Sequence, residues 1–479
     1  MLSGIITLLA SGLLVYSQTQ ALAWDEGFHL LAAQLIKAGK TPYLDFCFPQ
    51  TPLNAYWNAG WMRIFGDSWR AVHVVAALLT AGALLLAADF VFVRFRLPHD
   101  WRPAAALTAA LLIGLNTLIV RFGTVGQAYA LCLFLMVASF RVSILAVDRE
   151  HPIWAAAAGL LAAAAAGSSL LTAPVAPVLL LWILLYNRTG SRFRKFAAFT
   201  IGAVVAFVPV LWLCEEAPRQ VMFNLIQYHL FYRSVGWEDA VPHDLEVITS
   251  WVNSAQGLIL GLLAVAGLLF TIKGQSDRLW RQELYLCGWL ALALGLNSSS
   301  AHPTFEMYFV LMVPFLGILA AVGFYEVSSR LGPLSRPAWP VLILTVLLCL
   351  GLGKALYERR DDYSWRDLEE VAREVDRVTP PHAPLLADEH VYFLTRRMPA
   401  SGAEFSDSQK LNLPAALAAS LHIVPRAELA KRVQARTFNT VETCNHEDDD
   451  RFKVLGLPEV YAKKAVVHDC TIFWDVIRP

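Results

Sequence analysis

The strongest constraint on this chain is a series of long apolar segments separated by short polar connections. A helix needs ~20 mostly apolar residues to cross the hydrocarbon core of a bilayer. The 479 residues are 56% hydrophobic and only 16% charged, whereas soluble domains are about 25% charged. The low charge content indicates an integral membrane protein, and the net charge of zero gives no support for nucleic-acid binding.

The apolar segments predict about eleven transmembrane helices. They cover approximately residues 2–22, 71–93, 103–120, 127–147, 153–168, 171–186, 193–214, 255–272, 283–296, 307–327 and 340–356. The fifth and sixth segments are short and could instead form a helical hairpin that does not cross fully. The first segment ends in a signal-peptide-like Ala-Leu-Ala, but no Lys or Arg precedes it, which favours a retained span.

Basic residues predict the orientation of the spans. The connections 94–102, 148–150, 187–195, 273–281 and 328–336 alternate with the others, and four of the five hold at least two Lys or Arg. Such connections face the cytoplasm. The loops 23–70 and 215–254 and the segment after Tyr357 then lie outside. We therefore expect a membrane domain over residues 1–356 and an extracytoplasmic α/β domain over residues 357–479.

The first outer loop predicts two short helices in the membrane interface. Residues 28–36 form an amphipathic pattern that Gly39 would end as a C′ glycine. Residues 54–65 follow a proline-rich stretch and carry aromatic residues suited to headgroup depth.

Asp25 and Glu26 directly follow the first span and allow two interpretations. Acids near a helix N-terminus interact favourably with its dipole and are common outside the membrane. Carboxylates at a membrane surface can also act as a general base or bind a divalent cation. Glu26 and His29 are one helical turn apart, which suits either an oriented base or a metal site shared with Asp25. Composition does not decide between these interpretations.

The segment WDEGFHLLAAQLIKAGKTPYLDF and the following PQTPL resemble the first outer loop of GT-C glycosyltransferases. The protein mannosyltransferase and lipid A aminoarabinose transferase groups are the most similar. The matching features are the Asp-Glu pair, Gly39, Pro42-Tyr43-Leu44-Asp45 and Thr51-Pro52-Leu53. The stretch SSSAHPTFEMYFVLMVPFLGILAA also resembles a late span of these enzymes, and the resemblance extends loosely over residues 1–356. It implies a GT-C-like polytopic fold.

The resemblance implies a reaction at the outer face of a bacterial cytoplasmic (inner) membrane. The donor is a sugar on polyprenyl phosphate, and the acceptor is a hydroxyl of a glycan, lipid or protein. The hydroxyl attacks the anomeric carbon with inversion, and the lipid phosphate leaves. Asp25 would be the general base, and Glu26 would support it or hold the acceptor. A divalent cation is possible, and no other cofactor is expected.

Two positions depart from the family pattern. Pro49-Gln50-Thr51 stands where a Lys often precedes the Pro-Pro-Leu segment, so another cation must hold the donor phosphate or the donor differs. Gln127 replaces a second Asp near the fourth span. A glutamine there can bind a sugar hydroxyl but cannot act as a base. Asp45 could supply the second carboxylate or could cap a turn.

Several residues predicted to lie outside are candidate substrate ligands. His229, Tyr232 and Arg233 have i, i+3, i+4 spacing and would share one helical face, suited either to a sugar phosphate or to the membrane interface. Arg121 could bind phosphate or extend to the headgroups. His302 and Tyr308, at the start of the tenth span, could bind substrate, or be a loop histidine and an interfacial tyrosine.

The C-terminal segment predicts an alternation of helices and strands. Residues 365–378 have helical periodicity, whereas residues 383–397 predict a strand and a turn, with Asp388-Glu389-His390 on the surface. Residues 464–476 predict a strand. Cys444 and Cys470 can form a disulfide on an oxidising side. The CNHEDDD run could bind a metal or form a solvated loop.

Three other functions are compatible with this topology. A transporter or flippase for a lipid-linked substrate would normally show inverted repeats, and the sequence shows none. A sugar-chain polymerase or ligase would carry its large functional loops later in the chain. A non-catalytic assembly protein would explain the missing Lys and second Asp.

Overall fold

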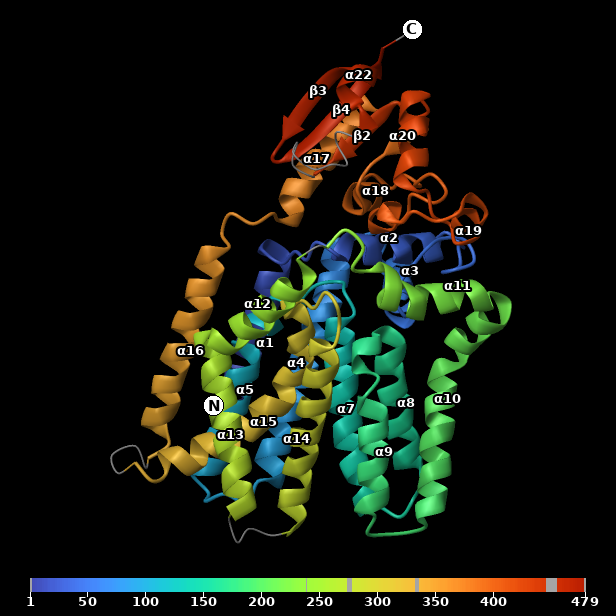
Figure 1. The fold of residues 1–479 in the computed structure, drawn as a ribbon. Coiled ribbons are helices and arrows are strands. Elements are labelled where there is room, and N and C mark those ends of the chain that lie inside the picture. Colours follow the sequence, from blue (N-terminus) through green and yellow to red (C-terminus); the bar gives the residue numbers. More distant parts are fainter. Residues whose placement is uncertain (1, 238, 274–277, 332–335, 445–454, 478–479) are drawn as a thin grey trace. The chain divides into compact units, whose positions relative to one another are not determined.

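The computed structural model describes residues 2–237, 239–273, 278–331, 336–444 and 455–477. The chain forms two compact units (Figure 1). Unit 1 comprises Met1–Ala21, His73–Val210 and Asp239–Asp362. Unit 2 comprises Leu22–Val72, Leu211–Glu238 and Tyr363–Pro479, and so combines the first long loop and the first part of the second with most of the C-terminal segment. The CNHEDDD run lies almost wholly outside the described residues.

Unit 1 is helical throughout its described part. Its elements are α1 (Leu2–Thr19), most of α4 (Trp69–Arg94), α5 (Trp101–Gly114), α6 (Thr117–Phe122), α7 (Tyr129–Asp148), α8 (Ile153–Ser168), η1 (Leu170–Thr172), α9 (Val175–Leu185), most of α10 (Arg192–Glu216), α12 (Ala240–Asn253), α13 (Ala255–Lys273), α14 (Arg278–Ser299), η3 (Glu306–Met312), α15 (Val313–Ser328) and α16 (Ala338–Glu358).

Helices lie at all eleven predicted spans. Among the described residues, seven helices are long and apolar enough to cross a membrane: α1, α4, α7, α10, α13, η3 with α15, and α16. Three shorter apolar helices, α5, α8 and η1 with α9, cover the third, fifth and sixth segments. Helix α14 covers the ninth segment. The predicted polytopic helical fold is confirmed.

The third predicted span is not one continuous helix. Helix α5 ends at Gly114, and α6 begins anew at Thr117. Asn116 lies between them in an extended conformation, and its side chain accepts a hydrogen bond from the backbone N–H of Leu118. Asparagine favours such a helix start because its side chain satisfies an N–H that has no partner within the helix. The prediction of one helix over 103–120 was wrong for this reason.

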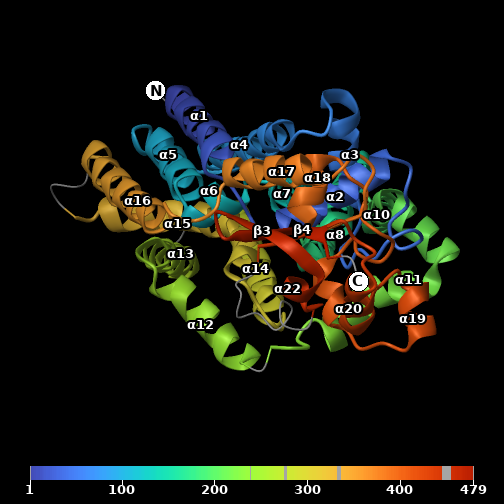
Figure 2. The same ribbon diagram turned by 90° about the horizontal axis from the view of Figure 1, so that it is seen from above.

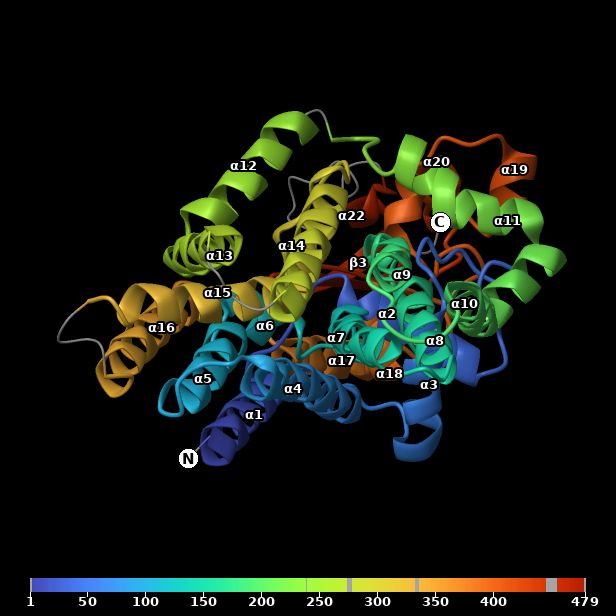
Figure 3. The ribbon, with the colours of Figure 1, turned by 90° about the horizontal axis from the view of Figure 1, so that it is seen from below.

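Helices α13 and α15 pack backbone to backbone in unit 1 (Figure 3). A Cβ atom on Gly323 would lie 1.9 Å from the carbonyl oxygen of Leu263, and one on Gly267 would lie 2.2 Å from that of Leu319. Small residues permit close approach of helices that have no hydrophobic driving force between them in lipid. These two glycines are therefore required by the packing.

Unit 2 contains shorter elements. They are α2 (Glu26–Lys37), α3 (Leu53–Phe65), α11 (Pro218–Met222), the π-helix η2 (Phe223–Tyr232), α17 (Trp365–Val378), β1 (Leu385–Leu386), α18 (Glu389–Thr395), η5 (Ser406–Lys410), α19 (Ala415–Ser420), α20 (Arg426–Gln434), β2 (Thr440–Thr443), α22 (Leu457–Val460), β3 (Tyr461–Val467) and β4 (Cys470–Val476). Figure 2 shows α17 beside β3 and β4.

A four-stranded mixed sheet organises the C-terminal part of unit 2. Its order is β1-β2-β4-β3, with β1 parallel to β2 and the other pairs antiparallel. The segment predicted as one strand over 464–476 is instead part of a hairpin, because His468 adopts a positive φ and turns the chain between β3 and β4. Cys444 and Cys470 form the predicted disulfide.

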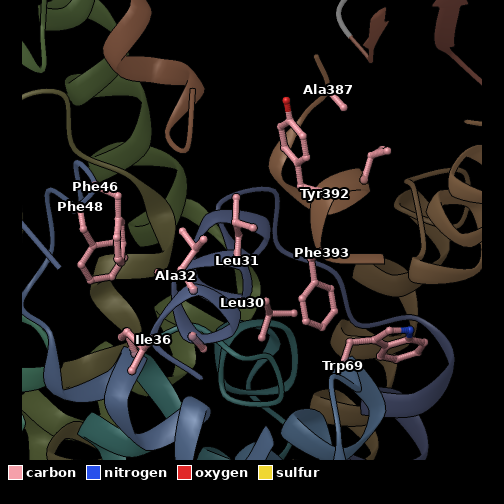
Figure 4. Packing of buried hydrophobic residues seen from close by; sticks show 14 of the residues in the cluster. Leu30, Leu31, Ala32, Ile36, Phe46, Phe48, Trp69, Ala387, Tyr392 and Phe393 are labelled. Carbon is pink, nitrogen blue, oxygen red and sulfur yellow. The ribbon is translucent and has the colours of Figure 1, made fainter. Parts of the chain in front are cut away.

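One hydrophobic core joins the three segments of unit 2. It includes Leu30 and Ile36 of α2, Val221 of α11, and Trp365 and Phe393 of the C-terminal segment. Figure 4 shows side chains of α2 packed near Tyr392, Phe393 and Trp69. Gly39 ends the helix with a positive φ, as predicted. However, α2 is buried on nearly every face, so the amphipathic pattern understated its enclosure.

Candidate functional site

Asp25 occupies the N-cap position of α2, but its side chain makes no capping hydrogen bond there. The side chain is accessible to solvent, yet protein surrounds it at longer range. This partial desolvation raises the pKa of the Asp25 carboxyl, the positive charge of Arg233 opposes the rise, and the negative charge of Asp407 adds to it. A carboxylate with a raised pKa is a stronger base than an ordinary aspartate and stays accessible to a substrate.

Glu26 is fully buried behind Asp25. Its Oε2 accepts a hydrogen bond of 3.1 Å from Nε1 of Trp365. Burial lowers the pKa of both His29 and His390 to about 4, and the charge of Glu26 opposes the shift. Both imidazoles are therefore neutral at pH 7. Among the described residues, Nδ1 of His29 and Nε2 of His390 have no hydrogen-bond partner.

Asp388-Glu389-His390 does not form a surface turn, and that prediction was wrong. Asp388 precedes α18, and His390 is only 4% exposed. Its imidazole packs against Gly27 so closely that a Cβ on Gly27 would lie 2.5 Å from Nδ1. The helix is short and its buried face is set by α2, which is distant in sequence, so local periodicity could not reveal it.

Lys410 and Tyr228 both contact Asp407, one of the two charged residues that act on Asp25. Lys410 donates to the backbone carbonyl of Arg233 at 2.9 Å and forms an ion pair of 3.1 Å with Asp407. Tyr228 donates a hydrogen bond to the other oxygen of Asp407. The structure thus links Arg233 and Asp407, the two charges that act on Asp25, through Lys410.

The spacing argument for His229, Tyr232 and Arg233 was wrong in its geometry. The segment Phe223–Tyr232 is a π-helix, so residues five apart, rather than four, are hydrogen-bonded neighbours. Nε2 of His229 lies 2.9 Å from the carbonyl oxygen of Pro49, and Tyr232 packs on Phe223. Burial, together with the charge of Arg233, lowers the pKa of His229 to about 4, so a neutral His229 donates to Pro49.

Asp45 and Gln50 belong to a tight turn in the first loop. Oδ2 of Asp45 accepts a hydrogen bond of 2.7 Å from the backbone N–H of Thr41. The hydroxyl of Tyr43, a buried residue with positive φ, donates to the carbonyl oxygen of Gln50 at 2.5 Å. Asp45 therefore caps a turn, which is the structural one of its two predicted roles.

The remaining predicted ligands belong to unit 1. Arg121 pairs with Glu306 at 2.5 Å, and Nδ1 of His302 lies 2.7 Å from Oδ2 of Asp244. Tyr308 is 9% exposed. Gln127 is 3% exposed, and its Oε1 has no hydrogen-bond partner among the described residues.

A divalent-cation site is not assembled by Asp25, Glu26 and His29. Within the described part of the chain, the only group of His, Cys, Asp or Glu side chains with closely spaced ligand atoms is Glu442, Cys444 and Cys470. Those two cysteines are joined in the disulfide and cannot act as thiolate ligands. The ligand atoms of Asp25, Glu26 and His29 are thus not gathered into such a group in the described part of the chain.

Sequence reasoning missed Asp407, Lys410 and Trp365 as neighbours of the first loop. Asp407 and Lys410 lie in the one-turn helix η5, which has too few residues to show periodicity. Trp365 is the first residue of helix α17, which periodicity correctly predicted. Its contact with Glu26, however, spans 339 positions. No local pattern encodes such a contact.

No protein-family model and no curated protein sequence matches the chain. Solved structures do match. ArnT from Cupriavidus metallidurans in the apo state is 14% identical with a TM-score of 0.70, and the match covers 98% of each chain. The fold is that of the GT-C glycosyltransferases.

Two further structures support this fold. ArnT bound to undecaprenyl phosphate matches with a TM-score of 0.68, 14% identity and 98% of each chain covered. The archaeal oligosaccharyltransferase AglB from Archaeoglobus fulgidus, in complex with an inhibitory peptide and a dolichol-phosphate, matches with a TM-score of 0.52 and 12% identity. That match covers 97% of this chain and 72% of AglB. The fold predicted from the Asp-Glu loop is confirmed.

Proposed function

We propose that this protein is a glycosyltransferase that moves a sugar from a polyprenyl-phosphate donor to an acceptor hydroxyl, with inversion. The observation that carries the proposal is Asp25, an accessible carboxylate with a raised pKa beside the charge of Arg233. Its support is the GT-C fold, since the ArnT structure of this fold binds undecaprenyl phosphate.

In this proposal Asp25 removes the proton of the acceptor hydroxyl as that oxygen attacks the anomeric carbon. A raised pKa brings the base closer to the operating pH, which favours proton transfer in the transition state. Glu26 holds the start of α2 through Trp365 and so positions Asp25. The neutral His29 adds no positive charge that would weaken the base.

The leaving lipid phosphate needs positive charge, and the first loop lacks the expected Lys at Gln50. We assign this role to Arg233 and Lys410. Lys410 reaches the carbonyl of Arg233 from the C-terminal segment, and its side chain is only 14% exposed. Charge on a phosphate is stabilised more strongly by cations that are shielded from water.

The proposal also places both long loops and residues 357–479 on the outer side of a bacterial cytoplasmic membrane. All three segments share one hydrophobic core, so they must lie on the same side. The Cys444–Cys470 disulfide suits an oxidising compartment. The positive-inside pattern of the short connections agrees with this side.

The test is transfer of labelled sugar from membrane lipid in cells that express wild type, Asp25→Asn or no protein. We expect Asp25→Asn to lower transfer by about 10²- to 10⁴-fold, the usual contribution of a general base. Asp67→Asn is the matched control, because Asp67 lies in the same loop and only pairs with Lys37 at 2.9 Å. Equal transfer by Asp25→Asn and wild type would exclude Asp25 as the base. Equal transfer in cells that lack the protein and in cells that express wild type would exclude the proposed glycosyltransferase activity.

The phosphate assignment has its own test. Lys410→Gln should raise the KM for the lipid donor more than it lowers kcat, because it removes a charge that holds the phosphate. Lys431→Gln, on helix α20, is the control. An unchanged KM in Lys410→Gln would exclude Lys410 as a ligand of the donor phosphate and would not affect the role proposed for Asp25.

A further inference from the structure

Unit 1 contains a long apolar groove lined by residues of α1, α5 and α16. Its volume is about 1130 Å³, and it is lined by side chains such as Leu9, Leu13, Leu107 and Leu352. Ligand pockets for small molecules usually measure roughly 300–1,000 Å³. The groove follows α16 from Ala338 to Leu356, which is about 27 Å at 1.5 Å per residue. It thus runs parallel to the spans, as a lipid chain does.

A polar pocket of about 470 Å³ lies on the other face of α16. Its lining includes Arg121, Glu306, Lys354, Glu358 and Arg359. The guanidinium groups of Arg121 and Arg359 lie 2.5 and 3.3 Å from the same Oε1 atom of Glu306. Lys354 pairs with Glu358 at 3.5 Å. The pocket therefore offers both cations and anions.

The two hollows adjoin at the end of α16 that is predicted to face outward. Helix α16 lines the groove with Cys349, Leu352 and Leu356 and lines the pocket with Lys354 and Glu358. The turn between α5 and α6 does the same, since Leu115 lines the groove and Asn116 lines the pocket. An apolar channel at membrane depth that ends beside a charged pocket suits an amphiphile.

We propose that this composite site binds one phospholipid with a zwitterionic headgroup. An acyl chain lies in the groove, the phosphate meets Arg121 and Arg359, and the ammonium meets Glu306 and Glu358. The charge pattern selects this occupant. The pocket presents three cations, Arg121, Lys354 and Arg359, and two carboxylates, Glu306 and Glu358. A phosphate-ammonium headgroup offers a charge of opposite sign to both sets, whereas a polyprenyl phosphate offers none to the carboxylates.

Two glycines of α1 provide a matched test of the groove. Gly12 lines the groove, Gly4 does not, and a Cβ on either would meet no atom within 4 Å. Gly12→Leu therefore fills the groove without disturbing the packing, and Gly4→Leu makes the same change elsewhere on the helix. Each protein is released for native mass spectrometry from nanodiscs of equal parts phosphatidylethanolamine and phosphatidylglycerol. Wild type and Gly4→Leu should each retain one phospholipid that Gly12→Leu loses. Equal retention in all three would overturn the proposal.

The headgroup assignment is tested by Arg359→Gln, with Arg360→Gln as the control. Arg360 pairs with Asp361 and does not line the pocket. Wild type and Arg360→Gln should retain phosphatidylethanolamine over phosphatidylglycerol several-fold, and Arg359→Gln should lose that preference. Preferential retention of phosphatidylglycerol by wild type, or of a polyprenyl phosphate added to the nanodiscs, would overturn the assigned occupant.

Discussion

Glu389 is predicted to make the segment that carries Asp407 and Lys410 sensitive to pH. Oε1 of Glu389 accepts a hydrogen bond of 2.6 Å from the backbone N–H of Ser406, at the start of η5. Burial, with the nearby charge of Asp388, raises the pKa of Glu389 from 4.5 to about 7. Between pH 4.5 and about 7, the Glu389 carboxyl is thus mostly neutral in the folded protein, whereas in the unfolded chain it is mostly ionised.

The sign and size of the effect follow from this raised pKa. The folded state binds the extra proton, so the stability that this proton confers is complete below pH 4.5 and is lost as the pH rises to about 7. A pKa moved from 4.5 to about 7 corresponds to at most about 3.5 kcal/mol, or roughly 300-fold in the opening equilibrium, at ~1.4 kcal/mol per unit. Glu389→Gln keeps the acceptor for Ser406 and removes the titration.

Hydrogen exchange of the full-length protein measures this local opening. Peptides covering residues 401–411 should lose protection in wild type between pH 5 and pH 8, after correction for the intrinsic exchange rate. In Glu389→Gln the loss of protection should be smaller and the protection at pH 8 should exceed that of wild type. The remaining loss is assigned to Glu404, whose pKa is also raised to about 7 by burial. Glu428→Gln is the control, because Glu428 is exposed on α20 and pairs only weakly with Arg432, at 3.6 Å. The same loss of protection in wild type and Glu389→Gln would refute the reasoning.

Three further predictions concern the same unit. Asp407→Asn should lower the pKa of Asp25, because a negative charge that raises this pKa is lost. The acid limb of the pH profile of the transfer rate should therefore move to lower pH, and an unmoved limb would contradict this. Gly27→Ala should lower the free energy of unfolding by about 1–3 kcal/mol, because the new Cβ would collide with the imidazole of His390. The loss is measured as a lower Tm, and an unchanged Tm would contradict this packing. Replacing Cys444 and Cys470 together by Ala should destabilise unit 2 by about 3–4 kcal/mol, because the disulfide closes a loop with a sequence separation of 26. Limited proteolysis measures the effect, and an unchanged cleavage rate would contradict it.

Much of the candidate site could be predicted because its signals are local. The Asp25-Glu26 pair, Gly39 and the turn around Asp45 lie within a few positions of one another, and each acts through its own backbone or the next helical turn. Arg233 was also found from sequence, although through a spacing argument that the π-helix does not obey. The chemistry of the residues thus selected candidates even where the assumed helix geometry did not hold.

A resemblance in the first loop predicted the GT-C fold. The sequence by itself determined the membrane class and the order of the apolar helices. Those properties depend on the cost of burying polar groups in lipid, which each segment must satisfy through its own composition. Only the tertiary structure decided what surrounds Asp25. Trp365, Asp407 and Lys410 reach the first or second loop across long sequence separations, and their short polar segments carry no periodic pattern. The electric field at a carboxylate and its desolvation depend on the groups that lie near it in space. Around Asp25 these groups are brought together when three separate segments fold onto one hydrophobic core.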